Sequence, residues 1–204
     1  MAKESFKERV KRELIKSSQK YTEIYVDYEY LICSDAFVKK AYYIVDAHED
    51  NFQHLTGVHS NISPKDFFNK CYLGILTEND FDFIKKGQNE KSVKGTVRRK
   101  IQALSNMMKL FEDGLQAEEN FKKNNVSCSF ATADNSCTLG FSESEKVRPK
   151  SLIKGNELIS SKQVELILRK KAGEKYFGEI VVGNEKALYK YKECIKDLLD
   201  SSLL

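Results

Sequence analysis

The chain contains three histidines, and all of them fall between His48 and His59. The middle one, His54, lies in the run Asn51-Phe-Gln-His-Leu-Thr-Gly-Val-His59, two residues before the hydroxyl of Thr56. An imidazole can change its charge near neutral pH, so a histidine close to a hydroxyl suits acid–base or phosphate chemistry. The same pattern is also typical of a hydrogen-bonded histidine with a structural role in a sheet, and both interpretations stay open.

A second set of polar side chains could complete such a site without a metal ion. Arg98, Arg99 and Lys100 could hold a phosphate group and neutralise the charge that develops in a transition state. Hydroxyl groups could hydrogen-bond a phosphate oxygen. Together with His54 and Thr56, these residues suit RNA cleavage by attack of the 2′-hydroxyl group. The hydroxyls in question belong to Ser127, Ser129, Thr132 and Thr138.

Other chemistries lack their sequence signatures. The chain has no GxxxxGK followed by Ser or Thr, no GxGxxG after a strand and no HExxH, so neither a glycine-rich phosphate cradle nor that zinc motif is indicated. The spacings among the histidines and Cys71 match no standard zinc pattern. The five cysteines are odd in number and form no CxxC, which favours reduced thiols. We therefore predict no metal and no cofactor.

The pattern of apolar residues predicts the strands that would position these side chains. The His54 run is expected to form a short strand that ends in a bend near Gly57, with Leu55 and Val58 directed to the core. Three antiparallel pairs are also expected from period-two alternation and turn residues. These pairs are Tyr28–Cys33 with Lys40–Asp46, Ser127–Thr132 with Cys137–Phe141, and Val164–Arg169 with Phe177–Val182.

Helical periodicity is clearest from about Ser92 or Val93 to Glu112. The apolar stripe there is Val93, Val97, Ile101, Leu104, Met108 and Phe111. Arg98, Arg99 and Lys100 fall off that stripe, and because successive helical residues differ by about 100°, at most one or two of them can face a common groove. Further helices are predicted from residue 3 to about 20, from Ser63-Pro64 to near Gly74, and over Glu185–Leu199.

The order of elements predicts the fold class. Strands and helices do not alternate singly, and the predicted hairpins require antiparallel neighbours, so we predict an α+β fold. A twisted antiparallel sheet would pack against an N-terminal helix, central helices and a C-terminal helix. We predict an N-terminal helical segment at 1–27, an α+β domain at 28–183, and a C-terminal helix at 184–204 that packs on the same domain.

Composition sets broad limits on the partners. The chain has 204 residues, of which 41% are hydrophobic, and a net charge of +4, which permits a nucleic-acid partner without requiring one. The N-terminus is charged and lacks the apolar stretch of a signal peptide. No apolar run approaches the roughly 20 residues that cross a bilayer. We expect a cytoplasmic protein with no membrane contact.

Six runs along the chain resemble one known family. They are Tyr42-Tyr43-Ile44-Val45, Asn51–Val58, Lys94–Ile101, Ser127–Thr132, Thr138–Phe141 and Arg148-Pro149-Lys150-Ser151. The similarity is to a phage-associated family placed in the barnase–EndoU–colicin–RelE-like (BECR) group of nucleases, and it extends from Tyr28 to Val182.

The resemblance implies one or two helices on a twisted antiparallel sheet, and metal-independent RNase activity carried on mobile elements. It makes His54 the candidate general base or acid and Thr56 its hydroxyl neighbour. Arg99 or Lys100 would contact phosphate. The predicted substrate-binding residues are Arg98, Ser129, Thr132 and Thr138.

Three functions follow as hypotheses. The first is a metal-independent ribonuclease with RNA as its partner, such as a toxin or phage effector. The second is a catalytically inactive binding protein of mobile-element origin, for example an inhibitor of a host defence system or a nucleic-acid-binding regulator, in which His54 would be buried and hydrogen-bonded. The third is a small metalloenzyme. An antitoxin or a host defence protein would be the protein partner.

Overall fold

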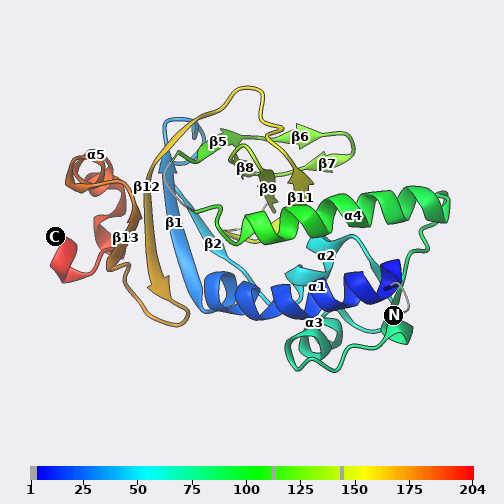
Figure 1. Ribbon diagram of the computed structural model, residues 1–204. Helices are drawn as coiled ribbons and strands as arrows, with labels where there is room; N and C mark the ends of the chain where they lie inside the picture. Colours follow the sequence, from blue (N-terminus) through cyan, green and yellow to red (C-terminus); the bar gives the residue numbers. More distant parts are fainter. Residues whose placement is uncertain (1–3, 112–113, 143–144) are drawn as a thin grey trace.

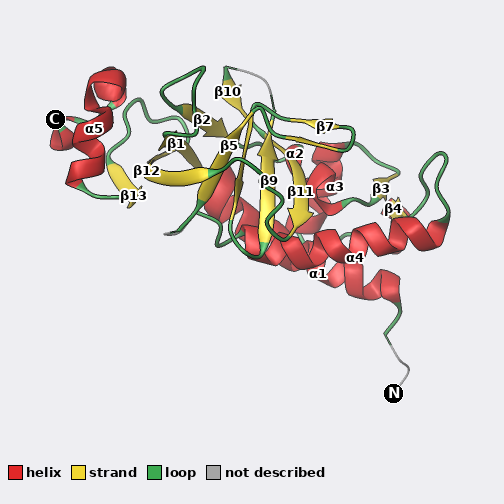
Figure 2. Ribbon diagram, turned by 90° about the horizontal axis from the view of Figure 1, so that it is seen from above, coloured by secondary structure: helices red, strands yellow, loops and turns green. Residues whose placement is uncertain are grey.

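Helices cover both faces of one large twisted sheet (Figure 1 and Figure 2). The computed structural model describes residues 4–111, 114–142 and 145–204. Within these residues, nine strands form the large sheet, and two further pairs of short strands lie outside it. Four helices pack on one face of the sheet, and the C-terminal helix packs on the other.

The helices begin where capping residues predict. Ser63 accepts a hydrogen bond from the backbone N–H of Asp66, and Pro64 is the first helical residue after it, as expected for a capped helix start. No helix among the described residues has both the length and the apolar character that crossing a membrane requires. The α-helices are α1 (Phe6–Tyr21), α2 (Asn51–Thr56), α3 (Pro64–Tyr72), α4 (Glu90–Met107) and α5 (Glu185–Ile195), joined by the π-helical segment η1 (Thr22–Val26) and the 3-10 turns η2 (Glu78–Asp80), η3 (Lys196–Leu198) and η4 (Ser201–Leu203).

The strands of the large sheet lie in the order β10-β2-β1-β12-β5-β8-β9-β11, and β13 also pairs with β12. Within the described chain every pair is antiparallel except β10 with β2, which is parallel. The strands are β1 (Tyr28–Ser34), β2 (Tyr43–Asp46), β3 (His59–Ser60), β4 (Phe81–Asp82), β5 (Gln116–Glu119), β6 (Lys122–Lys123), β7 (Val126–Ser127), β8 (Phe130–Ala133), β9 (Cys137–Phe141), β10 (Lys146–Val147), β11 (Pro149–Lys154), β12 (Lys162–Lys171) and β13 (Glu179–Val182).

The α+β prediction is confirmed, and so are the three antiparallel pairs, which are β1 with β2, β8 with β9, and β12 with β13. Side chains alternate between the two faces of each strand. On β1, Tyr30 and Ile32 contribute to the core under α1 to α4, whereas Leu31 and Cys33 pack with α5. The sheet is therefore buried on both sides along β1 and β12.

The prediction of a strand at His54 is wrong, because this run forms the short helix α2. Phe52 and Leu55, three residues apart, are both buried, and side chains at that spacing share one side of a helix. Gly57 ends the helix in the left-handed conformation, with φ of 78°, where glycine is favoured. Leu55 and Val58 are buried, as predicted.

Helix α4 differs from its prediction in its bounds. It begins at Glu90 after the cap Asn89, and it ends at Met107. The predicted end, Glu112, lies outside the described residues, as does the predicted start of the first helix at residue 3. The residues that α4 buries are Val93, Val97, Ala103, Leu104 and Met107. Met108 and Phe111 of the predicted stripe are also buried just after the helix, and Ile101 packs partly buried against the same core, so the predicted stripe is confirmed and the buried face also includes Ala103 and Met107.

Candidate active site

The C-terminal end of α2 is capped by hydrogen bonds of its own residue Thr56. Thr56 is buried, and its hydroxyl donates a hydrogen bond to the carbonyl oxygen of Gln53 at 2.7 Å. The same hydroxyl oxygen accepts a long hydrogen bond, 3.4 Å, from the backbone N–H of Val58. With Gly57 in the left-handed conformation, these contacts satisfy polar groups at the helix end. Thr56 therefore positions the end of α2 and does not face solvent.

Lys100 of α4 holds the same helix end from outside. Its Nζ donates a hydrogen bond to the backbone carbonyl oxygen of His54 at 2.9 Å. Its methylene stem lies against Gly57, where an added Cβ would be only 2.8 Å from Lys100 Cδ. The two segments that the sequence predicted to share a site, around His54 and around Lys100, are thus brought together.

Lys100 occupies an inward position on α4. Val93, Val97, Lys100, Leu104 and Met107 follow one another at spacings of four, three, four and three residues, which is one face of a helix. The other four members are buried apolar residues, and Lys100 itself is partly buried. The expectation that Lys100 falls off the apolar stripe is therefore wrong, because the inner face includes Lys100 as well as Ile101.

The charge of Lys100 has no counter-ion among the described residues. The ion pairs within residues 4–111, 114–142 and 145–204 do not include Lys100. Burial, and to a lesser extent the positive charge of Lys85, lower the pKa of Lys100 to about 8. A partly buried cation close to a second cation is an environment that a bound anion would stabilise.

The side chain of His54 is exposed on α2. Of the hydrogen bonds and ion pairs formed by the described residues, none involves its imidazole, whereas its backbone carbonyl accepts from Lys100. His54 is therefore not the buried, hydrogen-bonded side chain that a structural role would require. The other two histidines pair with acids: His48 Nε2 lies 3.4 Å from Asp46, and His59 Nδ1 lies 3.1 Å from Asp82.

The two arginines before Lys100 point elsewhere. Arg99 is exposed, and its guanidinium donates to the hydroxyl of Thr96 at 3.3 Å. Arg98 lies with its guanidinium carbon 5.5 Å from the centre of the Phe6 ring. The prediction that the three basic residues cannot share one face is confirmed, and Lys100 is the member of the three that reaches the end of α2.

The predicted hydroxyl residues do not gather around one cleft. Thr132 pairs across the sheet with Leu139, on the side of α4, whereas Thr138 pairs with Ala133 on the opposite side. The Thr138 hydroxyl donates to the carbonyl of Gly155 at 2.7 Å, and that of Ser129 donates to the carbonyl of Ser142 at 2.9 Å. Thr132 Oγ1 is buried and has no hydrogen-bond partner among the described residues.

A charged cluster that the sequence analysis missed lies on the other face of the sheet. The side chain of Glu29 on β1 is only 7% exposed, with Lys146 Nζ at 2.9 Å and Lys170 Nζ at 3.5 Å. The hydrogen bond to Glu29 raises the pKa of Lys146. Asp46 lies beside Glu29 on β2. The sequence feature that could have revealed this cluster is Glu29 itself. It is an acidic residue that lies on the same face of the strand as the buried Leu31 and Cys33.

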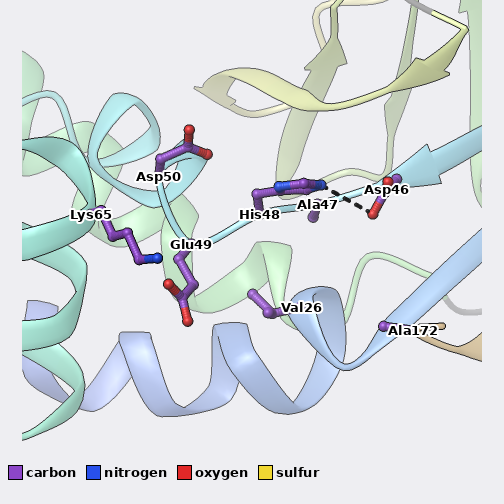
Figure 3. A pocket seen from close by; sticks show the side chains of 8 residues that line it. All are labelled: Val26, Asp46, Ala47, His48, Glu49, Asp50, Lys65 and Ala172. Atoms are coloured by element: carbon purple, nitrogen blue, oxygen red, sulfur yellow. Dashed lines mark ion pairs between the residues drawn. The ribbon is translucent and has the colours of Figure 1, made fainter.

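A hollow of about 430 Å³ opens next to Asp46 and His48 (Figure 3). In Figure 3 the imidazole of His48 is turned toward Asp46, and the carboxylates of the neighbouring Glu49 and Asp50 point in opposite directions. Three carboxylates and one lysine, Lys65, give this lining a net negative charge. Such a surface repels a polyanion, so the hollow does not suit an RNA phosphate.

Metal binding has no obvious location in the described chain. Among those residues, no group of three or more His, Cys, Asp or Glu side chains is arranged to hold a metal ion. His48, His54, His59 and Cys71 do not form the cluster considered from the sequence. Cys71 is buried on α3, and burial raises the pKa of its thiol to about 12.

Comparison with protein families places this fold in a class of nucleases. The family described as phage-Barnase-EndoU-ColicinE5/D-RelE like nuclease4 matches residues 13–195. The chain therefore belongs to this family, and the resemblance seen in the sequence is confirmed. A search of curated proteins and a search of solved structures each find no match.

Proposed function

We propose that the protein is a metal-independent ribonuclease whose active site lies where the end of α2 meets the inner face of α4. The observation that carries the proposal is Lys100, an inward-facing ammonium group that has no carboxylate partner among the described residues and is hydrogen-bonded to the backbone of an exposed histidine. A phosphate group of RNA would supply the missing negative charge and would lie beside His54. The family supports the nuclease class.

The chemistry follows from these two side chains. The 2′-oxygen of the substrate attacks the adjacent phosphorus, and the bond from phosphorus to the 5′-oxygen of the next nucleotide breaks. His54 accepts the proton of the 2′-hydroxyl group. Lys100 stabilises the charged phosphoryl oxygens, and with a pKa of about 8 it can also donate a proton to the leaving 5′-oxygen. The products are a 2′,3′-cyclic phosphate and a 5′-hydroxyl, and DNA is not cleaved.

The remaining predicted residues take other roles in this proposal. Thr56 is a positioning residue, because its hydroxyl is used within the helix end. Arg99, which is exposed, contacts a phosphate of the strand outside the cleavage position. The hydroxyl groups of Ser129, Thr132 and Thr138 do not contact the cleaved phosphate in this proposal.

We also propose that the protein acts in the cytoplasm as a toxin or effector of a phage or another mobile element. The family description refers to phages. The five cysteines are thiols and not disulfides, and four of them are buried, which fits a reducing compartment. A cell that makes such a ribonuclease would need a protein inhibitor, so an antitoxin is the expected partner.

The test is cleavage of mixed-sequence RNA in EDTA by wild-type protein and by His54→Ala. Wild type should cleave RNA but not DNA, and His54→Ala should lower the rate by about 10²–10⁴-fold. Circular dichroism should be unchanged, because the imidazole is exposed. His59→Ala removes an exposed imidazole that pairs with Asp82, and it should cleave like wild type.

Two outcomes would contradict the proposal. Unchanged cleavage by a folded His54→Ala protein would remove His54 from the site. No cleavage by folded wild type, on any RNA, would favour the inactive binding protein of mobile-element origin instead.

A further inference from the structure

A hollow of about 280 Å³ lies between α1 and α4, which run side by side (Figure 1). It is separate from the acidic hollow beside His48, and its lining is more apolar and carries two arginines. The lining residues are Phe6, Arg9, Val10 and Glu13 from α1 and Arg98, Ile101 and Gln102 from α4.

Two guanidinium groups converge on one aromatic ring in this hollow. The guanidinium carbons of Arg9 and Arg98 each lie 5.5 Å from the centre of the Phe6 ring. Phe6 is braced by Phe83, whose ring centre is 5.2 Å away. Neither arginine is in an ion pair with another described residue. A guanidinium plane backed by an aromatic ring is a surface on which a nucleobase can stack.

The polar groups of the lining are suited to the edge of a base. Glu13 supplies a carboxylate, which accepts hydrogen bonds and cannot donate them when ionised. Its Oε1 accepts from Arg12 at 3.3 Å, which leaves Oε2 as the acceptor for a base. The side-chain oxygen of Gln102 accepts from Lys154 Nζ at 3.0 Å, which leaves its amide group as a donor. A carboxylate pairs with an exocyclic amino group, and adenine, cytosine and guanine have such a group whereas uracil does not.

We propose that this hollow binds one unpaired nucleobase of the RNA substrate and prefers a base with an exocyclic amino group over uracil. The inference rests on the proposed function, which places the cleaved phosphate at Lys100. Arg98 and Lys100 are two residues apart, on different sides of a helix about 10 Å thick. The bound base therefore belongs to a nucleotide adjacent to the cleaved phosphate or one position removed.

Fluorescence anisotropy with uncleavable 2′-O-methyl RNA tests this proposal. The probes are labelled heptamers of uridine in which the central residue is adenosine, cytidine, uridine or abasic. Wild type should bind the adenosine and cytidine probes about tenfold more tightly than the uridine and abasic probes. Arg98→Gln and Phe6→Leu should each remove most of this preference, and thermal melts should show that both variants remain folded.

Arg99→Gln is the matched control, because it removes the same charge from the next residue of α4, whose guanidinium contacts Thr96. It should keep the base preference. Equal affinity of wild type for all four probes, or an equal effect of Arg98→Gln and Arg99→Gln on every probe, would overturn the proposal. If only the base-binding proposal is wrong, His54-dependent cleavage in EDTA should still be observed. If the ribonuclease proposal is wrong, that cleavage should be absent, and the base preference can still be measured.

Discussion

At the scale of single residues, Lys100 shows how an inward-facing charged side chain can be hidden in a helical pattern. A lysine within a run of Arg-Arg-Lys is most simply assigned to a solvated face. The alternative assignment, with Lys100 between Val97 and Leu104 on the inner face, has the same periodicity but places a charge in the core stripe. Periodicity alone cannot choose between two apolar stripes that differ by one residue, because the choice depends on what α4 packs against.

The partly buried charge of Lys100 predicts a particular pH dependence of stability. Its pKa is lowered to about 8 in the folded protein, whereas the unfolded chain keeps the ordinary value of about 10.4. Between these values the unfolded state binds more protons, so wild-type stability rises with pH. Relative to wild type, Lys100→Met should therefore lose stability as the pH rises from 8 to 10, measured by urea unfolding.

An exposed lysine of the same helix gives the control for that experiment. Lys91→Met should keep a constant difference from wild type over the same pH range. A constant difference for Lys100→Met as well would show that Lys100 is solvated and that its charge needs no counter-ion. Lys100→Met should also lose cleavage of RNA at every pH.

At the scale of elements, the short helix α2 depends on its surroundings. Six residues are too few for a stable isolated helix, so Thr56, Gly57 and Lys100 must hold its end. This dependence explains why the sequence suggested a strand here, since a single helical turn has too few residues to show a period. Helix α4, with 18 residues, was predicted together with its apolar stripe, although its ends and the inward position of Lys100 were not.

Gly57→Ala should disrupt this helix end more than an equivalent change elsewhere. Gly57 has φ of 78°, and a Cβ there would meet Lys100 Cδ at 2.8 Å, whereas Gly74 has φ of 73° and no atom within 4 Å. Gly74→Ala should cost about 1–2 kcal/mol for the left-handed backbone alone. Gly57→Ala should cost more and should also reduce cleavage, measured by urea unfolding and by RNA hydrolysis. Equal losses of stability, with cleavage retained, would show that Lys100 moves aside freely.

At the scale of the whole molecule, the fold class and the family could both be predicted, because hairpins and motif runs are local features of the sequence. The order of the strands could not be predicted in this way. Strand β5 was missed, since Gln116–Glu119 contains a single buried residue, Ala117, and β11 was not among the predicted strands either. Its pairing with β9 depends on contacts distant in the chain.

Strand β12 joins the two halves of the sheet. Its residues Val164–Lys171 pair with β1, and Lys162 and Gln163 pair with β5. A chain stalled on the ribosome before residue 162 should therefore remain sensitive to protease, whereas a chain stalled well beyond residue 204 with an added linker should resist it. Resistance of the shorter stalled chain would show that the first half of the sheet is stable without β12.

The position of β12 in the chain orders the assembly of the sheet during synthesis. Chains grow at about 5–20 residues per second and fold by domains, and the strand that joins both halves of the sheet is made only after α1 to α4 and β1 to β11. The growing chain cannot complete the sheet beneath α2 and α4 until β12 has left the ribosome. The ribosome, itself built largely of RNA, therefore does not meet the completed site that we propose while those earlier segments are being made beside it.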